Sequence, residues 1–252
     1  MGRVIAVANQ KGGVGKTTTV MNLGAALAER QKRTLLIDLD PQAALTGSFG
    51  LQPQALERTI YNVLTRSDIP IAATIHAVRP YLSIVPSNID LAAAEVELVS
   101  AIGREYVLKD ALKGIRTRYD FILIDTAPNL GLLTVNALTA ADEVIIPIVC
   151  EFLAMRALNV LTHIVTRVRR RLNPNLRVLG ILGTMYDTRT IHTREMLAEL
   201  RSHFGDKVFD TVVSKSIRFA EAPAMHKSIL EYVSTHPGAE AYRYLAEVII
   251  NG

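Results

Sequence analysis

Short apolar runs rich in β-branched residues alternate with longer segments of helical periodicity along this chain of 252 residues. Alternation of this kind predicts βαβ units and a parallel sheet. Several of the apolar runs lack polar positions almost entirely, which is typical of strands that helices cover on both faces. The predicted strands are residues 4–8, 34–38, 82–85, 121–125, 143–149 and 177–183.

The helical pattern of apolar residues is equally regular. Turn signals such as Asn173-Pro174-Asn175 and His236-Pro237-Gly238 separate the elements, and the chain shows no repeat, low-complexity tract or long linker. We therefore predict one domain, residues 1–252, with an α/β fold in which helices cover both faces of a mostly parallel twisted sheet. The predicted helices are residues 17–29, 90–102, 107–117, 154–171, 193–204 and 239–249.

Composition narrows the class of protein. The hydrophobic share of 49% is enough for a large buried core at this length. No apolar run approaches the roughly 20 residues that cross a bilayer, and the N-terminus lacks the pattern of a signal peptide. The single cysteine, Cys150, excludes an internal disulfide, and its apolar neighbours predict a buried side chain. We expect a cytoplasmic protein without integral membrane association.

A phosphate-binding loop follows the first predicted strand. The segment Asn9-Gln10-Lys11-Gly12-Gly13-Val14-Gly15-Lys16-Thr17-Thr18 leads into a helical pattern, which is the strand–loop–helix context that such a loop requires. Its glycines permit close approach of phosphate oxygens, and the helix N-terminus directs partial positive charge at the anion. Lys16 is expected to contact the β- and γ-phosphates, and the Thr17 hydroxyl to bind Mg²⁺. The predicted nucleotide-binding residues of this P-loop NTPase motif are Gly12, Gly13, Val14, Gly15, Lys16, Thr17 and Thr18.

Carboxylates stand at the ends of two predicted strands. Asp38 and Asp40 end the strand at residues 34–38, and Asp125 ends the strand at residues 121–125. Ligands of open parallel sheets gather at the carboxyl ends of the strands, so these side chains are expected near the phosphate-binding loop. Asp125 fits the position that holds Mg²⁺ directly or through water. Capping of a turn is the alternative role for each aspartate, and it remains open above all for Asp38.

The loop departs from the general phosphate-binding pattern in one respect. Gln10 stands where that pattern has glycine, and Lys11 adds a second lysine. The resulting K-G-G-x-G-K-T-T form resembles the deviant Walker A motif of the ParA/MinD group of ATPases. The resemblance is to ParA/Soj proteins in particular and spans nearly the whole chain. It rests on the loop and on Asp38-Leu39-Asp40-Pro41-Gln42, Asp125-Thr126-Ala127-Pro128, Pro147-Ile148-Val149-Cys150-Glu151-Phe152 and Ile217-Arg218-Phe219-Ala220-Glu221-Ala222-Pro223.

The resemblance implies an ATPase that uses ATP and Mg²⁺ as a homodimer. In the group, the lysine at the position of Lys11 reaches across the dimer interface to the partner's nucleotide, as an arginine finger does. Asp40 resembles the aspartate that positions the attacking water and lies near the metal, and Asp38 the carboxylate beside it. Residues at the positions of Met185 and Pro223 lie beside the adenine. The implied catalytic residues are Lys11, Lys16, Asp40 and Asp125, with Thr17, Asp40 and Asp125 at the metal.

Charge is unevenly distributed. Net charge is +4, and the first 150 residues carry fourteen charges of each sign, so the whole excess lies in the last 102 residues. ParA relatives bind double-stranded DNA without sequence preference through basic residues of this half, and a ParB-like centromere-binding protein or cargo adaptor stimulates hydrolysis. The resemblance therefore implies a nucleoid-associated protein. The predicted DNA-binding residues are Arg189, Lys215, Arg218 and Lys227, whereas the arginine cluster at 167–171 is equally consistent with a solvated helix face.

The sequence disfavours two other classes of ATPase. A MinD-like ATPase on a membrane requires a C-terminal amphipathic helix with a basic face, but residues 244–252 contain Glu247 and no lysine. A relative of the nitrogenase iron protein requires two cysteines per chain for a shared iron–sulfur cluster, and only Cys150 is present. The chain also departs from ParA relatives, since Arg156-Ala157 and Lys215-Ser216 stand where the family often has Glu-Gly and Arg-Asn.

Overall fold

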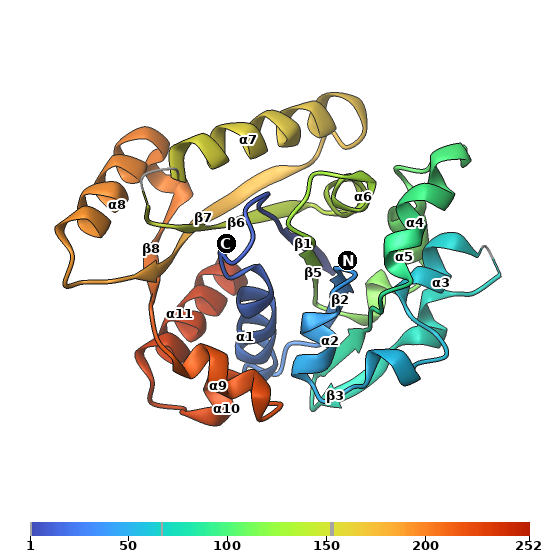
Figure 1. Cartoon of the computed structure of the whole chain (residues 1–252), viewed down its shortest axis with the longest axis horizontal. Helices are drawn as coiled ribbons and strands as arrows, with labels where there is room; N and C mark the ends of the chain where they lie inside the picture. Colours follow the sequence, from blue (N-terminus) through green and yellow to red (C-terminus); the bar gives the residue numbers. More distant parts are fainter. Residues whose placement is uncertain (1, 67, 152–153) are drawn as a thin grey trace.

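The computed structural model describes residues 2–66, 68–151 and 154–252, so Phe152 of the family segment lies outside the described residues. In this part of the chain eight strands form one sheet in the order β3-β4-β2-β5-β1-β6-β7-β8 (Figure 1). Neighbouring strands are parallel except β3 and β4, which form an antiparallel pair. The strands are β1 Arg3–Val7, β2 Thr34–Leu39, β3 His76–Arg79, β4 Leu82–Val85, β5 Phe121–Thr126, β6 Glu143–Val149, β7 Arg177–Tyr186 and β8 Val208–Ser214.

Helices connect the strands and cover both faces of the sheet. The α-helices are α1 Lys16–Glu29, α2 Ala44–Ser48, α3 Ile60–Thr65, α4 Leu91–Glu97, α5 Val107–Lys113, α6 Leu132–Ala140, α7 Ala154–Arg171, α8 Ile191–Phe204, α9 Arg218–Ala224, α10 Ile229–Tyr232 and α11 Pro237–Asn251. Short 3₁₀ turns are η1 Pro53–Ala55, η2 Ile71–Thr74, η3 Leu98–Ser100, η4 Arg116–Arg118 and η5 Gly205–Lys207. The predicted α/β fold with a mostly parallel sheet is confirmed.

Two hydrophobic layers pack on the sheet, one on each face. In β1, Val4 and Ala6 contact the layer that α3 to α8 provide, whereas Ile5 and Val7 contact the layer of α1, α2, α10 and α11. Figure 1 shows α6 and α7 on one side of the sheet and α1 and α11 on the other. Side chains of a strand alternate between the faces, so a strand covered on both sides is apolar throughout. This arrangement explains the continuous apolar runs of the sequence.

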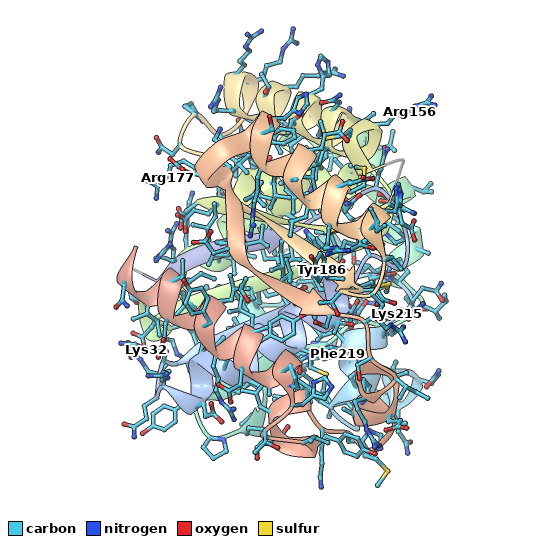
Figure 2. All side chains as sticks on the ribbon, turned by 90° about the vertical axis from the view of Figure 1, so that its left-hand side faces the viewer. Lys32, Arg156, Arg177, Tyr186, Lys215 and Phe219 are labelled. Carbon is cyan, nitrogen blue, oxygen red and sulfur yellow. The ribbon has the colours of Figure 1, made fainter. Side chains whose placement is uncertain are left out.

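The strand ends define two opposite edges of the molecule. Figure 2 shows Lys32 and Arg177 on one side, where Lys32 precedes β2 and Arg177 begins β7. Lys215, which follows β8, and Arg156 near the start of α7 lie on the other side. The loop between β1 and α1 belongs to this second edge, because it follows the carboxyl end of β1. The candidate site is therefore at the edge where ligands of parallel sheets bind.

Several element predictions were wrong in extent or missed an element. The helix predicted at 90–102 ends at Glu97 and continues only as a 3₁₀ turn. The apolar residues Val96, Val99 and Ile102 that extended the periodicity are exposed, so their spacing does not reflect packing in this chain. The helix predicted at 107–117 likewise ends at Lys113. The elements without a sequence prediction are β3, β8, α2, α3, α6, α9 and α10.

Candidate nucleotide-binding site

The loop between β1 and α1 is held in shape by its own side chains and glycines. Gly13 and Gly15 have φ values of 71° and 87°, in the left-handed region that favours glycine. The Asn9 amide donates to the Pro147 carbonyl oxygen at 2.8 Å, and its own oxygen accepts from the Lys11 backbone N–H at 3.0 Å. Asn9 therefore attaches the start of the loop to the end of β6.

Strand β7 approaches the loop closely from the other side. The Thr184 hydroxyl donates to the Val14 carbonyl oxygen at 2.9 Å. A Cβ atom added to Gly15 would lie 3.7 Å from the Thr184 methyl carbon. Gly15 also precedes the first residue of α1, so its backbone turns the chain into the helix. The loop is thus enclosed between β6 and β7 at the N-terminus of a 14-residue helix, where backbone N–H groups favour an anion.

Lys16 folds back over this loop. Its side chain is buried, and the ammonium donates to the Lys11 carbonyl oxygen at 3.2 Å. Burial lowers the pKa of Lys16, and the charges of Asp125 and Asp40 raise it in part. A buried cation enclosed by backbone and carboxylates is positioned to bind the terminal phosphates of a nucleotide.

Asp125 lies beside the loop, and within the described part of the chain its carboxylate accepts no hydrogen bond. It ends β5 and is paired in register with Val7 of β1 and Asp38 of β2. Burial raises the pKa of Asp125 well above its usual range, and the charge of Asp38 adds to the rise. The nearby Thr17 hydroxyl lowers this pKa, but it does not form a hydrogen bond with the carboxylate. Among the described residues, both carboxylate oxygens of Asp125 are therefore without a hydrogen-bond partner. A buried carboxylate left in this state is unfavourable unless a cation binds it.

The two aspartates of β2 differ in their surroundings. The Asp38 carboxylate accepts from the Thr46 N–H at 2.8 Å and from the Thr46 hydroxyl at 2.6 Å. Burial raises the pKa of Asp38 to about 6, although these hydrogen bonds lower it. Asp40 is half-buried, and one of its oxygens accepts from the Gln42 N–H at 2.9 Å. Asp38 therefore anchors the turn after β2, as the capping alternative expected, whereas Asp40 retains an accessible oxygen.

The residues at this edge fit Mg²⁺ bound together with a nucleotide. The described ranges contain no group of three or more His, Cys, Asp or Glu side chains that would hold a metal alone. Magnesium usually takes one or two protein ligands and completes its shell with phosphate oxygens and water. The unpartnered oxygens of Asp125 and the nearby hydroxyl of Thr17 match this requirement.

A mainly apolar cavity of about 300 Å³ adjoins the first turn of α1. It has the size and lining that suit a nucleoside base. Met185 is part of its wall, whereas Pro223 lies inside α9 and is not part of the wall. The lining residues are Gly15, Thr18, Thr184, Met185, Val213, Ser214, Lys215, Ser216, Ile217, Phe219 and Tyr242.

Lys11 does not lie over the loop. Its ammonium forms an ion pair with Glu151 at 2.8 Å, and both side chains are exposed. Glu151 directly follows β6, so the pair joins the loop to the segment that leads to α7. The exposed position of Lys11 at the edge is compatible with a contact to a second chain.

The four predicted DNA-binding residues are all exposed. Arg189 follows β7, Lys215 follows β8, Arg218 begins α9 and Lys227 follows α9. Lys215 also lines the apolar cavity, and Arg218 stands between its lining residues Ile217 and Phe219, so these two cations are close to the candidate nucleotide site. The exposed arginines of the cluster at 167–171 lie at the C-terminal end of α7, where positive charges interact favourably with the helix dipole.

Sequence reasoning missed several residues that shape the site. Asn9 and Thr184 fix the loop, and Glu151 pairs with Lys11. Phe219 and Tyr242 close the cavity with an edge-to-face ring contact. Asn9 and Glu151 stand inside recognised motifs, but their partners are more than a hundred residues away in the sequence. Only the fold shows these contacts.

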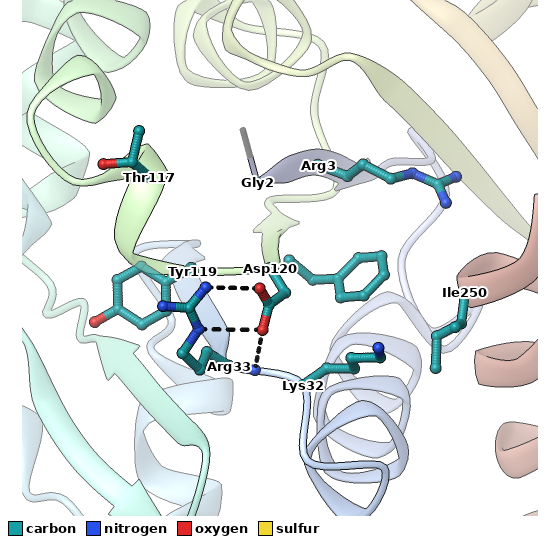
Figure 3. Close-up of a pocket in the computed structure, with 9 residues that line it drawn as sticks. Gly2, Arg3, Lys32, Arg33, Thr117, Tyr119, Asp120 and Ile250 are labelled. Carbon is teal, nitrogen blue, oxygen red and sulfur yellow. Dashed lines mark hydrogen bonds and ion pairs between the residues drawn. The ribbon is translucent and has the colours of Figure 1, made fainter.

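A pocket of about 350 Å³ at the opposite edge does not compete with this site (Figure 3). Arg33 donates two side-chain hydrogen bonds to Asp120 there, at 2.8 and 3.2 Å. Arg3 pairs with Glu143 at 2.8 Å. These cations are already neutralised within the chain, and the pocket is at the amino ends of β1, β2 and β5, away from the loop.

Known proteins resemble this chain over nearly all of its length. A family model described as an AAA domain matches residues 2–178. The chain is 45% identical over 257 residues to the sporulation initiation inhibitor protein Soj of Bacillus subtilis (strain 168), with 100% of each chain covered. It is 43% identical over 251 residues to the chromosome partitioning protein ParA of Myxococcus xanthus (strain DK1622), with 99% of this chain and 88% of that one covered. The chain belongs to the ParA/Soj family of P-loop ATPases.

Solved structures place this ParA/Soj-family chain in the same fold. A Mycobacterium smegmatis structure described as cobyrinic acid a,c-diamide synthase with bound ADP and magnesium has a TM-score of 0.88 and 40% sequence identity. The match covers 99% of this chain and 94% of that one.

The C-terminal helix of this ParA/Soj-family chain is part of the core. Tyr242, Leu245 and Ile249 of α11 are buried in the layer that includes α1. The apolar stripe of α11 therefore packs on protein, unlike that of a helix that binds a membrane surface. None of the helices in the described ranges is long and apolar enough to cross a bilayer.

Proposed function

We propose that this ParA/Soj-family chain is an ATP-dependent switch that forms a homodimer around Mg·ATP, binds DNA in that state and hydrolyses ATP slowly. The cycle drives chromosome or plasmid segregation, or positions another cargo on the nucleoid. Asp125 is the observation that carries the proposal, because among the described residues its two buried oxygens have no hydrogen-bond partner, and they lie near Lys16 and Thr17. ADP and magnesium in the M. smegmatis structure support the choice of nucleotide and metal.

The chain's residues divide the binding work. Loop N–H groups and Lys16 bind the phosphates, and the apolar cavity holds the base. Asp125 and Thr17 hold Mg²⁺, which when bound neutralises phosphate charge. Asp40 keeps one accessible oxygen for orienting the attacking water, and Lys11 supplies a cation to the partner's nucleotide once two chains meet. A cation supplied in trans makes hydrolysis depend on dimerisation.

DNA binding is expected to follow the nucleotide state. Two chains that close over the nucleotide edge bring two copies of Arg189, Lys215, Arg218 and Lys227 to one surface. Phosphate contacts need charge and reach but no base reading, so the affinity is independent of sequence and sensitive to salt. A ParB-like DNA-binding protein or cargo adaptor is the proposed partner that stimulates hydrolysis.

Binding isotherms with duplex DNA test the proposal. They are measured with ATP, with ADP and without nucleotide, each at low and moderate salt. The expected result is tight, salt-sensitive binding with ATP and weak binding in the other two states. Equal weak binding in all three states contradicts a DNA switch.

An amide-forming activity, suggested by the description of the M. smegmatis structure, is less consistent with this chain. When glutamine supplies the nitrogen, such a reaction uses a cysteine thiolate to release ammonia from it. Cys150 is the single cysteine, and burial raises its pKa to about 11, which disfavours the thiolate. ATP turnover measured with DNA and with a corrinoid acid separates the two functions, because only the true substrate or partner accelerates it.

A further inference from the structure

Lys215 and Arg218, two of the proposed DNA-binding residues, stand in the segment 213–219 that lines the base cavity. With Arg189 after β7 and Lys227 after α9 they make up the group of cations that we call the rim. The Lys215 backbone N–H donates to the Tyr186 carbonyl oxygen at 3.0 Å, which joins the segments that follow β7 and β8. Met185 and Ile217 from these segments line the cavity. Figure 2 shows Tyr186 and Lys215 near each other on this edge. Arg218 stands between the lining residues Ile217 and Phe219, and Arg189 follows the lining residue Met185 by four positions.

Both arginines of the rim are already engaged by carboxylates of their own chain. Arg189 donates to Asp187 through two side-chain nitrogens, at 2.9 and 2.7 Å. Arg218 donates to Glu221 at 2.6 Å, one helical turn further along α9. The Tyr232 hydroxyl donates to the same Glu221 oxygen at 3.2 Å and fixes the carboxylate in place. Each carboxylate occupies guanidinium N–H groups that a DNA phosphate requires.

The lysines of the rim differ from the arginines. Lys215 and Lys227 are exposed, and within the described part of the chain neither forms an ion pair. The rim therefore offers two available cations and two paired ones. An incoming phosphate must displace a carboxylate from each arginine, and it approaches against the negative charge of that carboxylate.

We propose that Glu221 and Asp187 compete with DNA phosphates for Arg218 and Arg189 and so weaken the DNA affinity of each chain. The inference rests on the proposed DNA-binding function and adds a means by which the chain regulates it. Exposed ion pairs are weak, so the competition moderates binding without abolishing it. A dimer, which has four rim cations on each chain, still binds DNA, whereas a single chain binds DNA poorly. This difference in affinity makes the nucleotide-dependent switch sharper.

Neutral isosteres of the two carboxylates test the inference. Glu221→Gln keeps an oxygen that accepts from Tyr232, and Asp187→Asn keeps one that accepts from the Arg189 N–H at 3.0 Å. The matched control is Asp110→Asn, which removes the same charge from an exposed pair with Lys113 at 2.8 Å on α5. Binding of each variant to a fluorescent duplex of random sequence is measured with ATP between about 50 and 200 mM salt.

The expected result is a several-fold gain in affinity at low salt for each rim variant and none for the control. The slope of log K against log salt becomes steeper by about 1, since one more phosphate contact releases counterions. Unchanged affinity and slope in both rim variants overturn the inference. Weaker binding, as expected for Arg218→Ala, also overturns it, because Glu221 then orients Arg218 for DNA. If the unmodified protein lacks ATP-dependent DNA binding, the proposed function itself fails.

Discussion

The Lys11 ammonium forms an ion pair with the Glu151 carboxylate of its own chain at 2.8 Å. In the proposed function this lysine serves the nucleotide of a partner chain, which requires the pair to open before the dimer closes. Both side chains are exposed, and such pairs contribute about 1 kcal/mol or less. The ion pair is therefore weak enough for Lys11 to exchange Glu151 for a triphosphate. While the pair is formed, it stabilises the separate chain relative to the dimer.

Replacing Glu151 with Gln is expected to promote dimerisation. Loss of the two ion pairs, one in each chain, frees both copies of Lys11, and the ATP-dependent dimer becomes tighter by up to about thirtyfold. Analytical ultracentrifugation with ATP measures the dissociation constant. Glu105→Gln is the control, because it removes a carboxylate that pairs with Arg104 at 3.2 Å. A dimer of unchanged affinity in Glu151→Gln shows that the pair does not restrain Lys11.

Asp125→Asn is expected to stabilise the protein without nucleotide and to remove the effect of magnesium. Burial raises the pKa of Asp125, so the folded state holds its proton more tightly than the unfolded state. The resulting stability is full below about pH 4 and is lost as pH rises through the folded-state pKa. At pH 8 the parent must either bury an unpaired charge or hold a proton that the unfolded chain releases, so the neutral variant gains about 1–3 kcal/mol.

Thermal unfolding with and without Mg·ATP measures both effects of Asp125→Asn. The unmodified protein gains stability with Mg·ATP, and the variant gains much less. The parent's stability without ligand is also expected to fall between acidic pH and pH 8 more steeply than that of the variant. A variant less stable than its parent at pH 8 would show that Asp125 has a structural partner instead.

The central strands were predictable because burial on both faces leaves a distinctive sequence. β8 was not predictable, because it is an edge strand whose residues are partly exposed, and its sequence mixes polar and apolar residues. α6 contains nine residues that are mostly buried, so no polar face gives it a helical period. α9 contains Pro223, which usually argues against a helix. These elements exist because tertiary packing overrides their local signals.

The candidate site likewise contains features that the sequence predicts and features that only the fold shows. The phosphate-binding loop and the strand-end aspartates are local motifs, so their type and position were evident from the sequence. The pairing of Asp38 with Asp125 follows from the register of β2 and β5. The partners of Asn9 and Lys11 depend on where β6 ends, which no local pattern contains.

Cys150 is expected to resist modification in the folded protein. Burial raises the pKa of its thiol to about 11, so at pH 8 only about one molecule in a thousand carries a thiolate. A thiol reagent such as DTNB should react orders of magnitude more slowly with the folded protein than with the protein in denaturant. Equal rates in the two states would show that the end of β6 opens freely.

Asp40→Ala is expected to separate nucleotide binding from hydrolysis. Asp40 is half-buried, and in the described ranges its carboxylate accepts only from the N–H of the exposed Gln42, so the variant folds and binds ATP. Loss of the group that orients the water slows turnover by about 10²-fold or more, and the ATP dimer accumulates on DNA. Phosphate release and DNA retention are measured together, with Glu57→Ala at an exposed position as the control. Hydrolysis at the parent rate would exclude Asp40 from the reaction and leave the attacking water to another residue of the edge.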